Sequence, residues 1–280
     1  MKRIKGIKAM LQVVYAVFIR EMTIWLRYPS WILTFIALPY LFSGLFYGIG
    51  VAMGGQDAIS NFKEKIGVEN VFLYYVIGTS IFLASNILLS DVSGTIRSEQ
   101  LRGTFELQYL SPANKVLLWG SVVIPHGIIS SLVLVSTTLP IIIISASKIS
   151  IFNIITAVFF LLIGLIPLFG IAFTLAALTV KYKEPWAIAN ILNSLFSAFS
   201  GFTYPIWILP KWLQIISYLI PLTHINTITR ALLLFNQGLF SYKIEIILLA
   251  FYSIIYPLFG ISLFKRWEID AKKKGELSKY

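Results

Sequence analysis

Side chains that commonly perform chemistry are sparse in this sequence. Its 280 residues include two histidines, three aspartates and no cysteine. His126 follows Pro125 and His224 follows Thr223, and neither has a second ligand at the spacing of a metal site. We therefore expect both histidines to be structural. The sequence has no HExxH or paired-aspartate motif, so a membrane-embedded enzyme is a weak alternative. No G-x-x-x-x-G-K-[ST] loop is present either, so the chain cannot bind nucleotide phosphates in that way.

One segment, residues 91–115, alternates charged and apolar residues and reads DVSGTIRSEQLRGTFELQYLSPANK. The pattern covers about three helical turns, and Ser111-Pro112 then ends it. It predicts a short amphipathic helix over residues 96–110. The charged residues can form a solvated face, in which Arg102 and Glu106 have the i, i+4 spacing of an ion pair. A solvated face explains the charges but not the whole pattern.

The rest of the chain, which must position this segment, is unusually apolar. Hydrophobic residues make up 58% of the chain and charged residues 12%, and the mean hydropathy is +0.82. A soluble domain of this length cannot present such a composition to water, so the bilayer is the expected solvent. The net charge of +11 lies between apolar stretches and at the termini. Anionic lipid headgroups explain it better than nucleic acid does.

Seven charge-free windows are long enough to cross a hydrocarbon core of ~30 Å, which needs roughly 20 helical residues. Both termini are strongly basic and should face the cytoplasm, so the number of crossings must be even. The window from Trp212 to Thr229 is the shortest and contains Pro221 and His224, so we interpret it as re-entrant rather than spanning. The six predicted spans are at about 30–52, 70–91, 116–142, 152–180, 186–204 and 245–264. They place seventeen Lys and Arg inside and six outside.

An amphipathic helix is predicted before the first span, over residues 9–28. Gln12, Ala16, Arg20, Thr23 and Arg27 fall on one narrow polar stripe, opposite a broad apolar face. Such a helix lies in the plane of the cytoplasmic membrane surface. Glu21 lies off the polar stripe. It either pairs with a nearby basic residue or contacts a neighbouring subunit.

The segment SEQLRGTFELQYLSP resembles the signature of the ABC-2 type permease family, in which an acidic residue, Gly-Thr, an apolar residue, Glu and Ser-Pro follow the second span. The resemblance implies a coupling helix that docks in a groove of an ATPase subunit. The implied docking residues are Glu99, Arg102, Gly103, Thr104, Phe105 and Glu106. Among them Phe105 would be the apolar anchor, and the charges would set orientation and partner choice.

A second match covers YPIWILPKWLQIISYLIPLTHINTITRALLL, from Tyr204 to Leu234. It is similar to the broken re-entrant segment that the family places before its last span, here residues 207–236. The matching landmarks are Pro205, Leu209, Pro210, Trp212, Leu213, Pro221, Leu222, Thr223 and Arg230. The start of the chain, from Arg20 to Ile32, also looks like the family's interface helix, with Arg20, Glu21 and Arg27 as its charged residues. The expected fold is thus one all-α integral membrane domain of six transmembrane helices over residues 1–280.

This resemblance implies the membrane subunit of an exporter in the cytoplasmic membrane, with both termini in the cytoplasm. Two permeases, identical or different, would join two nucleotide-binding ATPases, which would hold the ATP and Mg; this chain would carry no cofactor. The substrate would be amphipathic: a drug, a lipid or a lipid-linked glycan. Candidates to line its path are Tyr40, Tyr47, Tyr74, Asn86, Asn190 and Asn193, although the same residues can serve interhelical hydrogen bonds or interfacial belts. A secondary transporter or channel without an ATPase is the main alternative.

Overall fold

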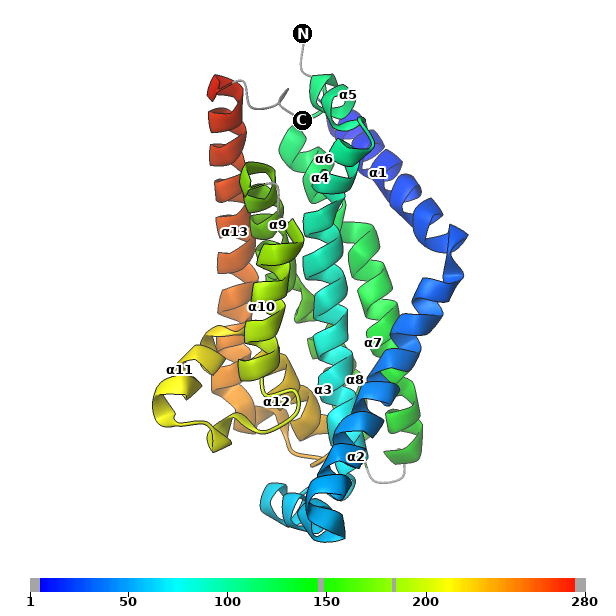
Figure 1. Cartoon of the computed structure of the whole chain (residues 1–280), viewed down its shortest axis with the longest axis vertical. Coiled ribbons are helices and arrows are strands. Elements are labelled where there is room, and N and C mark those ends of the chain that lie inside the picture. The colour runs from blue at the N-terminus through cyan, green and yellow to red at the C-terminus, as the bar shows by residue number, and fades with distance from the viewer. Residues whose placement is uncertain (1–5, 146–148, 183–184, 275–280) are drawn as a thin grey trace.

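The computed structural model describes residues 6–145, 149–182 and 185–274, and every regular element in these residues is a helix. The long helices stand roughly side by side in one bundle (Figure 1). In the described residues, six helical stretches are long and apolar enough to cross a membrane. They are Ile7–Arg27, Pro29–Ile66, Val71–Leu101, Lys115–Ile143, Ile151–Leu178 and Leu239–Asp270. The predicted all-α membrane fold is therefore confirmed.

These six stretches match the six predicted spans except for one: the structure has a long apolar helix at Ile7–Arg27 and no full-length one at 186–204. Helix α1 (Ile7–Arg27) is long and apolar enough to be included, although the sequence predicts an in-plane helix there. Helix α10 (Pro185–Phe199) has 15 residues and is shorter than a full span, because the chain leaves the helix before Gly201, whose φ is +71°. In Figure 1, α1 slants across the end that carries both termini, whereas α10 stands beside α9 (Leu165–Tyr182) in the bundle.

Helices α1 and α2 (Pro29–Ile66) are exposed on most of their surface. Tyr28 separates them, and Pro29 is the first residue of α2, where a proline needs no backbone partner. Near its other end α2 bends at Gly55, whose φ is +65°, and folds back (Figure 1). The side chains of Leu33 and Leu41 point outward and are about two-thirds exposed, as expected for a surface that faces lipid.

The central helix of the bundle is continuous from Val71 to Leu101. It consists of α3 (Val71–Asn86), a π-helical turn η1 (Ile87–Asp91) and α4 (Val92–Leu101). The predicted second span, 70–91, thus continues into the segment that the sequence assigns to the coupling helix. The central helix is buried against α2, α7 (Val123–Ser145), α9, α10 and α12 (Pro221–Leu233). The α3 part of this helix is apolar on all sides, which suits a position surrounded by other helices.

The remaining long helices pack closely through glycines. Helices α6 (Lys115–Gly120) and α7 form the fourth apolar stretch, and α8 (Ile151–Ile163) and α9 form the fifth. Helix α9 packs along α13 (Lys243–Lys274). A Cβ on Gly170 would lie 2.2 Å from the Tyr256 carbonyl carbon, and one on Gly260 would lie 2.5 Å from the Gly170 oxygen. Small residues let two membrane helices approach this closely.

A group of short elements lies at the end of the bundle opposite both termini (Figure 1). It contains η2 (Ile206–Ile208), α11 (Lys211–Leu219), α12 and η3 (Leu239–Tyr242). Pro210 precedes α11, and Pro221 is the first residue of α12. Pro221 is also the residue at which the sequence predicts a break, because proline cannot donate the backbone hydrogen bond that would continue α11.

Candidate functional site

The carboxylate of Glu99 joins three segments at the end of the bundle that carries the termini. Glu99 is buried near the C-terminus of α4. Its Oε2 accepts hydrogen bonds from the Thr104 hydroxyl and the Gln108 amide, and its Oε1 lies 3.3 Å from a guanidinium nitrogen of Arg20 and 3.5 Å from one of Arg102. We call Arg20, Glu99, Arg102, Thr104 and Gln108 the Glu99 network. A buried carboxylate needs such partners, and here they come from α1, α4 and the segment after α4.

Gly103 breaks the helix that the sequence predicts over residues 96–110. Its φ is +71°, a conformation that favours glycine, so α4 ends and a separate six-residue helix α5 (Phe105–Leu110) begins. The break also removes the i, i+4 register predicted for Arg102 and Glu106. Arg102 pairs with Glu99 instead, at i, i+3. Glu99 and Thr104 thus hold the turn together, and Gly103 lets it form.

Phe105 is buried inside the bundle, with 2% of its surface exposed. Its ring stacks on Trp119 with centroids 5.8 Å apart, and it belongs to a cluster with Phe173 and Phe264. The expected role of Phe105 as an anchor in a partner's groove does not fit this position, because its side chain offers no free surface. The alternation of charged and apolar residues places Phe105 on the apolar side of an amphipathic segment. It does not say whether that side packs against the chain's own bundle or against a partner protein.

The exposed residues of the turn form a different set. Leu101, Leu107 and Leu110 are each about two-thirds exposed, and Arg102 and Glu106 are exposed beside them. We call these five residues the turn surface. Three exposed leucines on so short a segment leave apolar surface that a partner could cover, whereas a fully solvated helix face would be polar. The sequence pattern did not single out these leucines. Gly103 ends α4 and changes the direction of the chain, so the exposed side of the residues after it cannot be read from a single helical pattern.

Lys115 supports the turn from the other side, which the sequence did not indicate. Its ammonium group donates to the backbone oxygens of Gln108, at 2.9 Å, and Ser111, at 2.7 Å. These oxygens lie at the C-terminal end of α5, where a cation is favoured by the helix dipole. Buried Phe105 and Lys115 therefore fix α5 on the bundle, and the turn surface remains exposed.

The charged residues of α1 have three different environments. Glu21 is buried and pairs with Arg20 at 2.5 Å, so pairing with a nearby basic residue accounts for it. Arg20 also reaches Glu99 and thereby connects α1 to the turn. Arg27 is exposed in the last turn of α1. Helix α1 is thus attached to the same network as α4 and α5.

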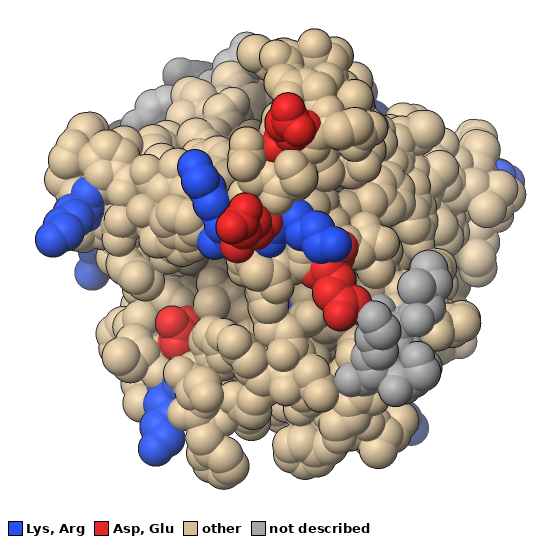
Figure 2. Space-filling model, turned by 90° about the horizontal axis from the view of Figure 1, so that it is seen from below, with Lys and Arg blue, Asp and Glu red and all other residues tan. Residues whose placement is uncertain are grey.

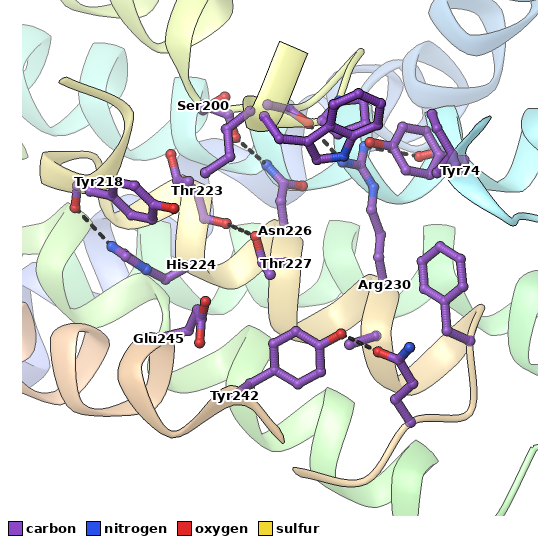
Figure 3. A pocket seen from close by; sticks show the side chains of 18 of the residues that line it. Tyr74, Ser200, Tyr218, Thr223, His224, Asn226, Thr227, Arg230, Tyr242 and Glu245 are labelled. Atoms are coloured by element: carbon purple, nitrogen blue, oxygen red, sulfur yellow. Dashed lines mark hydrogen bonds between the residues drawn. The ribbon is translucent and has the colours of Figure 1, made fainter. Parts of the chain in front are cut away.

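At the opposite end of the bundle, Arg230 joins α12 to α3 and to the chain after α10 (Figure 3). Its guanidinium donates to the carbonyl oxygens of Gly201, at 2.7 Å, Phe202, at 2.5 Å, and Tyr74, at 3.1 Å. The guanidinium carbon also lies 3.6 Å from the centre of the Tyr74 ring. Gly78 makes room, since a Cβ there would lie 2.3 Å from an Arg230 nitrogen. Arg230 thus ties the chain just after α10 to α3 and α12.

A cavity of about 590 Å³ adjoins Arg230, and Figure 3 shows its lining. We call it the Arg230 cavity. The His224 ring donates from Nε2 to the Tyr218 carbonyl at 2.8 Å, and the Asn226 amide donates to the Ser200 carbonyl at 3.3 Å. Five of its buried residues each carry a polar atom without a hydrogen-bond partner among the described residues: Ser200, Thr223, His224, Asn226 and Arg230. Buried polar atoms normally have partners, so this cavity suits water or a polar ligand.

The proline and tryptophan landmarks of the re-entrant segment have structural positions. Pro205 precedes η2 and also lines the Arg230 cavity, and Pro210 is the cap of α11. Trp212 is two-thirds exposed on α11, as an aromatic residue at a membrane surface is. Of the landmarks, Pro205, Thr223 and Arg230 meet at one cavity, which the sequence did not show.

A family model described as ABC-2 type transporter matches residues 12–234. The chain belongs to the ABC-2 type transporter family. No curated protein sequence matches it. As a family member it is the membrane component, or permease, of an ATP-binding cassette transporter, and the family implies an ATP-binding partner. The Glu99 network, the turn surface and helices α11 and α12 all lie within the matched residues.

The polar span residues of this permease have mostly structural contacts. The Tyr40 hydroxyl donates to the Thr137 carbonyl at 2.8 Å, and the Asn86 amide donates to the Phe82 carbonyl at 3.0 Å. Asn193 reaches Ser90, Tyr47 packs beside buried Tyr74, and Tyr74 lies under Arg230. Asn190 is exposed on α10. The interhelical alternative therefore fits most of these candidates better than a path lining does. In the described residues, no group of three or more metal-ligating side chains occurs.

Proposed function

We propose that this permease is the membrane subunit of an exporter and that its ATPase partner binds the turn surface. The observation that supports this is the arrangement of the turn: its apolar anchor Phe105 is buried, whereas Leu101, Leu107 and Leu110 are exposed above it. A partner that pushes on these leucines would move α5 and, through the Glu99 network, α1 and α4. Movement of the central helix would then shift the bundle.

We propose that the chain lies in the cytoplasmic membrane. The end of the bundle that carries the turn surface and both termini would face the cytoplasm. Figure 2 shows the opposite face, where charges of both signs are scattered. Among the described residues, the elements at that end carry Lys63, Lys65, Lys211, Arg230 and Lys243 against Asp57, Glu64, Glu69 and Glu245. The basic excess of the chain therefore lies toward the end with the termini, as the positive-inside rule requires. The exposed apolar surfaces of α2 and α13 would contact lipid.

A second permease is proposed to pack against α10. One stripe of α10 is exposed and contains Asn190, Ile191, Ser194 and Leu195. Small and polar residues on a membrane helix favour close contact with another helix. The chain has no cysteine, so Asn190→Cys introduces the sole thiol. We expect this variant to form a disulfide-linked dimer in membranes, and Ala189→Cys, at a buried neighbour, to form none. Monomers from both variants would contradict the proposed contact.

The test of the ATPase contact is co-purification of the tagged permease with its ATP-binding partner. We expect Leu107→Asp to lower the amount of bound ATPase by at least about tenfold, because a charge replaces an exposed apolar contact. Glu106→Lys should weaken binding by changing the charge pattern. Ile269→Asp is the control, since Ile269 is also exposed at this end of α13. If no ATPase binds to the wild type, the exporter is ruled out in favour of a channel or secondary transporter.

A further inference from the structure

A second cavity, of about 270 Å³, lies where α1, the start of α2, the central helix and α7 meet. We call it the Asp91 cavity. Its walls contain four aromatic residues and two carboxylates, and its complete lining is Glu21, Ile24, Trp25, Tyr28, Trp31, Phe35, Asp91, Thr95, Ser98, Arg102 and His126. It lies beside the Glu99 network, because it is bordered by Arg102, a member of the network, and by Glu21, which pairs with Arg20.

Asp91 is the one carboxylate of this cavity without an ion pair among the described residues, and the His126 ring lines the same cavity. Glu21 is paired with Arg20, and Arg102 is paired with Glu99. The carboxylate of Asp91 has no ion pair or hydrogen bond among the described residues. Asp91 is half-buried and ends the π-helical turn η1. π-Helical turns inside α-helices often occur at functional sites, and an ionisable residue of a membrane segment that lacks a partner is a candidate for ligand recognition.

The aromatic residues surround the same space. The ring centroids of Trp25 and Phe35 are 6.2 Å apart, and those of Trp31 and Phe35 are 6.3 Å apart. Trp25 also meets the edge of the buried His126 ring, at 6.1 Å. Aromatic faces attract organic cations, and tryptophan does so most strongly. A wall of aromatic rings with one free carboxylate therefore complements a positive charge on an apolar body.

The cavity is lined by exposed residues where α1 meets α2. Tyr28 and Trp31, at the junction of α1 and α2, are 56% and 59% exposed. Compounds with a cationic group and an apolar body concentrate at the surface of an anionic leaflet. We propose that the Asp91 cavity binds an amphipathic organic cation, with Asp91 facing its charge and Trp25, Trp31 and Phe35 its apolar part. That the bound cation is a transport substrate rests on the proposed function; the binding itself does not.

The experiment measures binding of tetraphenylphosphonium to the full chain in lipid nanodiscs, with empty nanodiscs as background. Tetraphenylborate has the same shape and the opposite charge and serves as the matched ligand control. We expect Asp91→Asn to weaken tetraphenylphosphonium binding by about tenfold or more, because a charged contact is lost. Asp57→Asn makes the same change at the far end of α2 and should leave binding unchanged.

The aromatic wall is tested separately. Trp25→Leu should weaken binding several-fold, whereas Trp25→Phe keeps a ring and should retain most of it. The inference is overturned if the wild type binds no more cation than empty nanodiscs, if tetraphenylborate binds equally well, or if Asp91→Asn binds like the wild type. None of these measurements uses the ATPase, so failure of cation binding and failure of the ATPase contact are distinguishable.

Discussion

A guanidinium nitrogen of Arg20 lies 3.3 Å from a carboxylate oxygen of Glu99, so the Glu99 network joins the N-terminal helix to the central helix. The two residues are far apart in the sequence and belong to two separate predicted helices, at residues 9–28 and 96–110. Their contact means that a force on α5 reaches α1 as well as α4. Helix α1, which also borders the Asp91 cavity, is therefore part of the mechanism that we propose for the turn.

Removal of the Glu99 charge should loosen this connection. Glu99→Gln keeps an acceptor for Thr104 but loses the ion pairs with Arg20 and Arg102, and we expect the free energy of unfolding to fall by about 1–3 kcal/mol. Thermal unfolding in detergent measures the change. Arg102→Gln is the control: Arg102 is half exposed, so we expect an effect below about 1 kcal/mol. Equal effects of both variants would contradict the central position of Glu99.

One alanine substitution on the buried side of α5 and one on its exposed side should have opposite effects on stability and on ATPase binding. Phe105→Ala should destabilise the permease by about 3–5 kcal/mol, because it leaves a cavity beside Trp119 and Phe264. Leu107→Ala should leave the melting temperature nearly unchanged, because Leu107 is 70% exposed, and should instead reduce ATPase binding. Melting curves and co-purification of the same two variants separate a packing residue from a docking residue. A stable Phe105→Ala variant that cannot bind the ATPase would restore the docking role of Phe105.

A substitution at Gly78 tests the contacts of Arg230 while leaving the arginine in place. A Cβ at Gly78 would lie 2.0 Å from the Phe202 oxygen, so Gly78→Ala must displace either the chain after α10 or Arg230. We expect a loss of about 1–3 kcal/mol and faster hydrogen exchange over residues 200–210. Gly44→Ala is the matched control, because nothing lies within 4 Å of its Cβ position. Helix propensity predicts that this control is neutral or up to about 1 kcal/mol stabilising.

His224 predicts a pH dependence of stability. Burial lowers the pKa of His224 below its ordinary value of 6.5, and its hydrogen bond to Tyr218 and the charge of Glu245 offset only part of this effect. The unfolded chain therefore takes up a proton first as the pH falls. The stabilisation is complete above the unfolded pKa and is lost below it. Melting temperatures at about pH 7.5 and about pH 5.5 should differ less in His224→Gln than in the wild type. An unchanged difference would assign the acid sensitivity to other groups.

Several features of this permease could be predicted from the sequence because they depend on local composition. Apolar windows of bilayer length predict membrane helices wherever they occur, and Pro221 predicts a break because proline lacks a backbone donor. The family motifs identified the segment around Gly103 and the position of Arg230. The length of α10 could not be predicted in this way, since the apolar window continues beyond Phe199 although the helix does not.

The sequence by itself determined the all-helical membrane fold, the family and the segments that carry its motifs. Only the tertiary structure decided which side of each segment is free. Phe105 and Leu107 are both apolar and two residues apart, yet Trp119, Phe173 and Phe264 bury the first and leave the second exposed. The partners of Glu99, and the absence of an ion pair for Asp91 within the part of the chain that the structure describes, were decided in the same way. Burial and charge pairing depend on residues distant in the chain, so local patterns do not contain them.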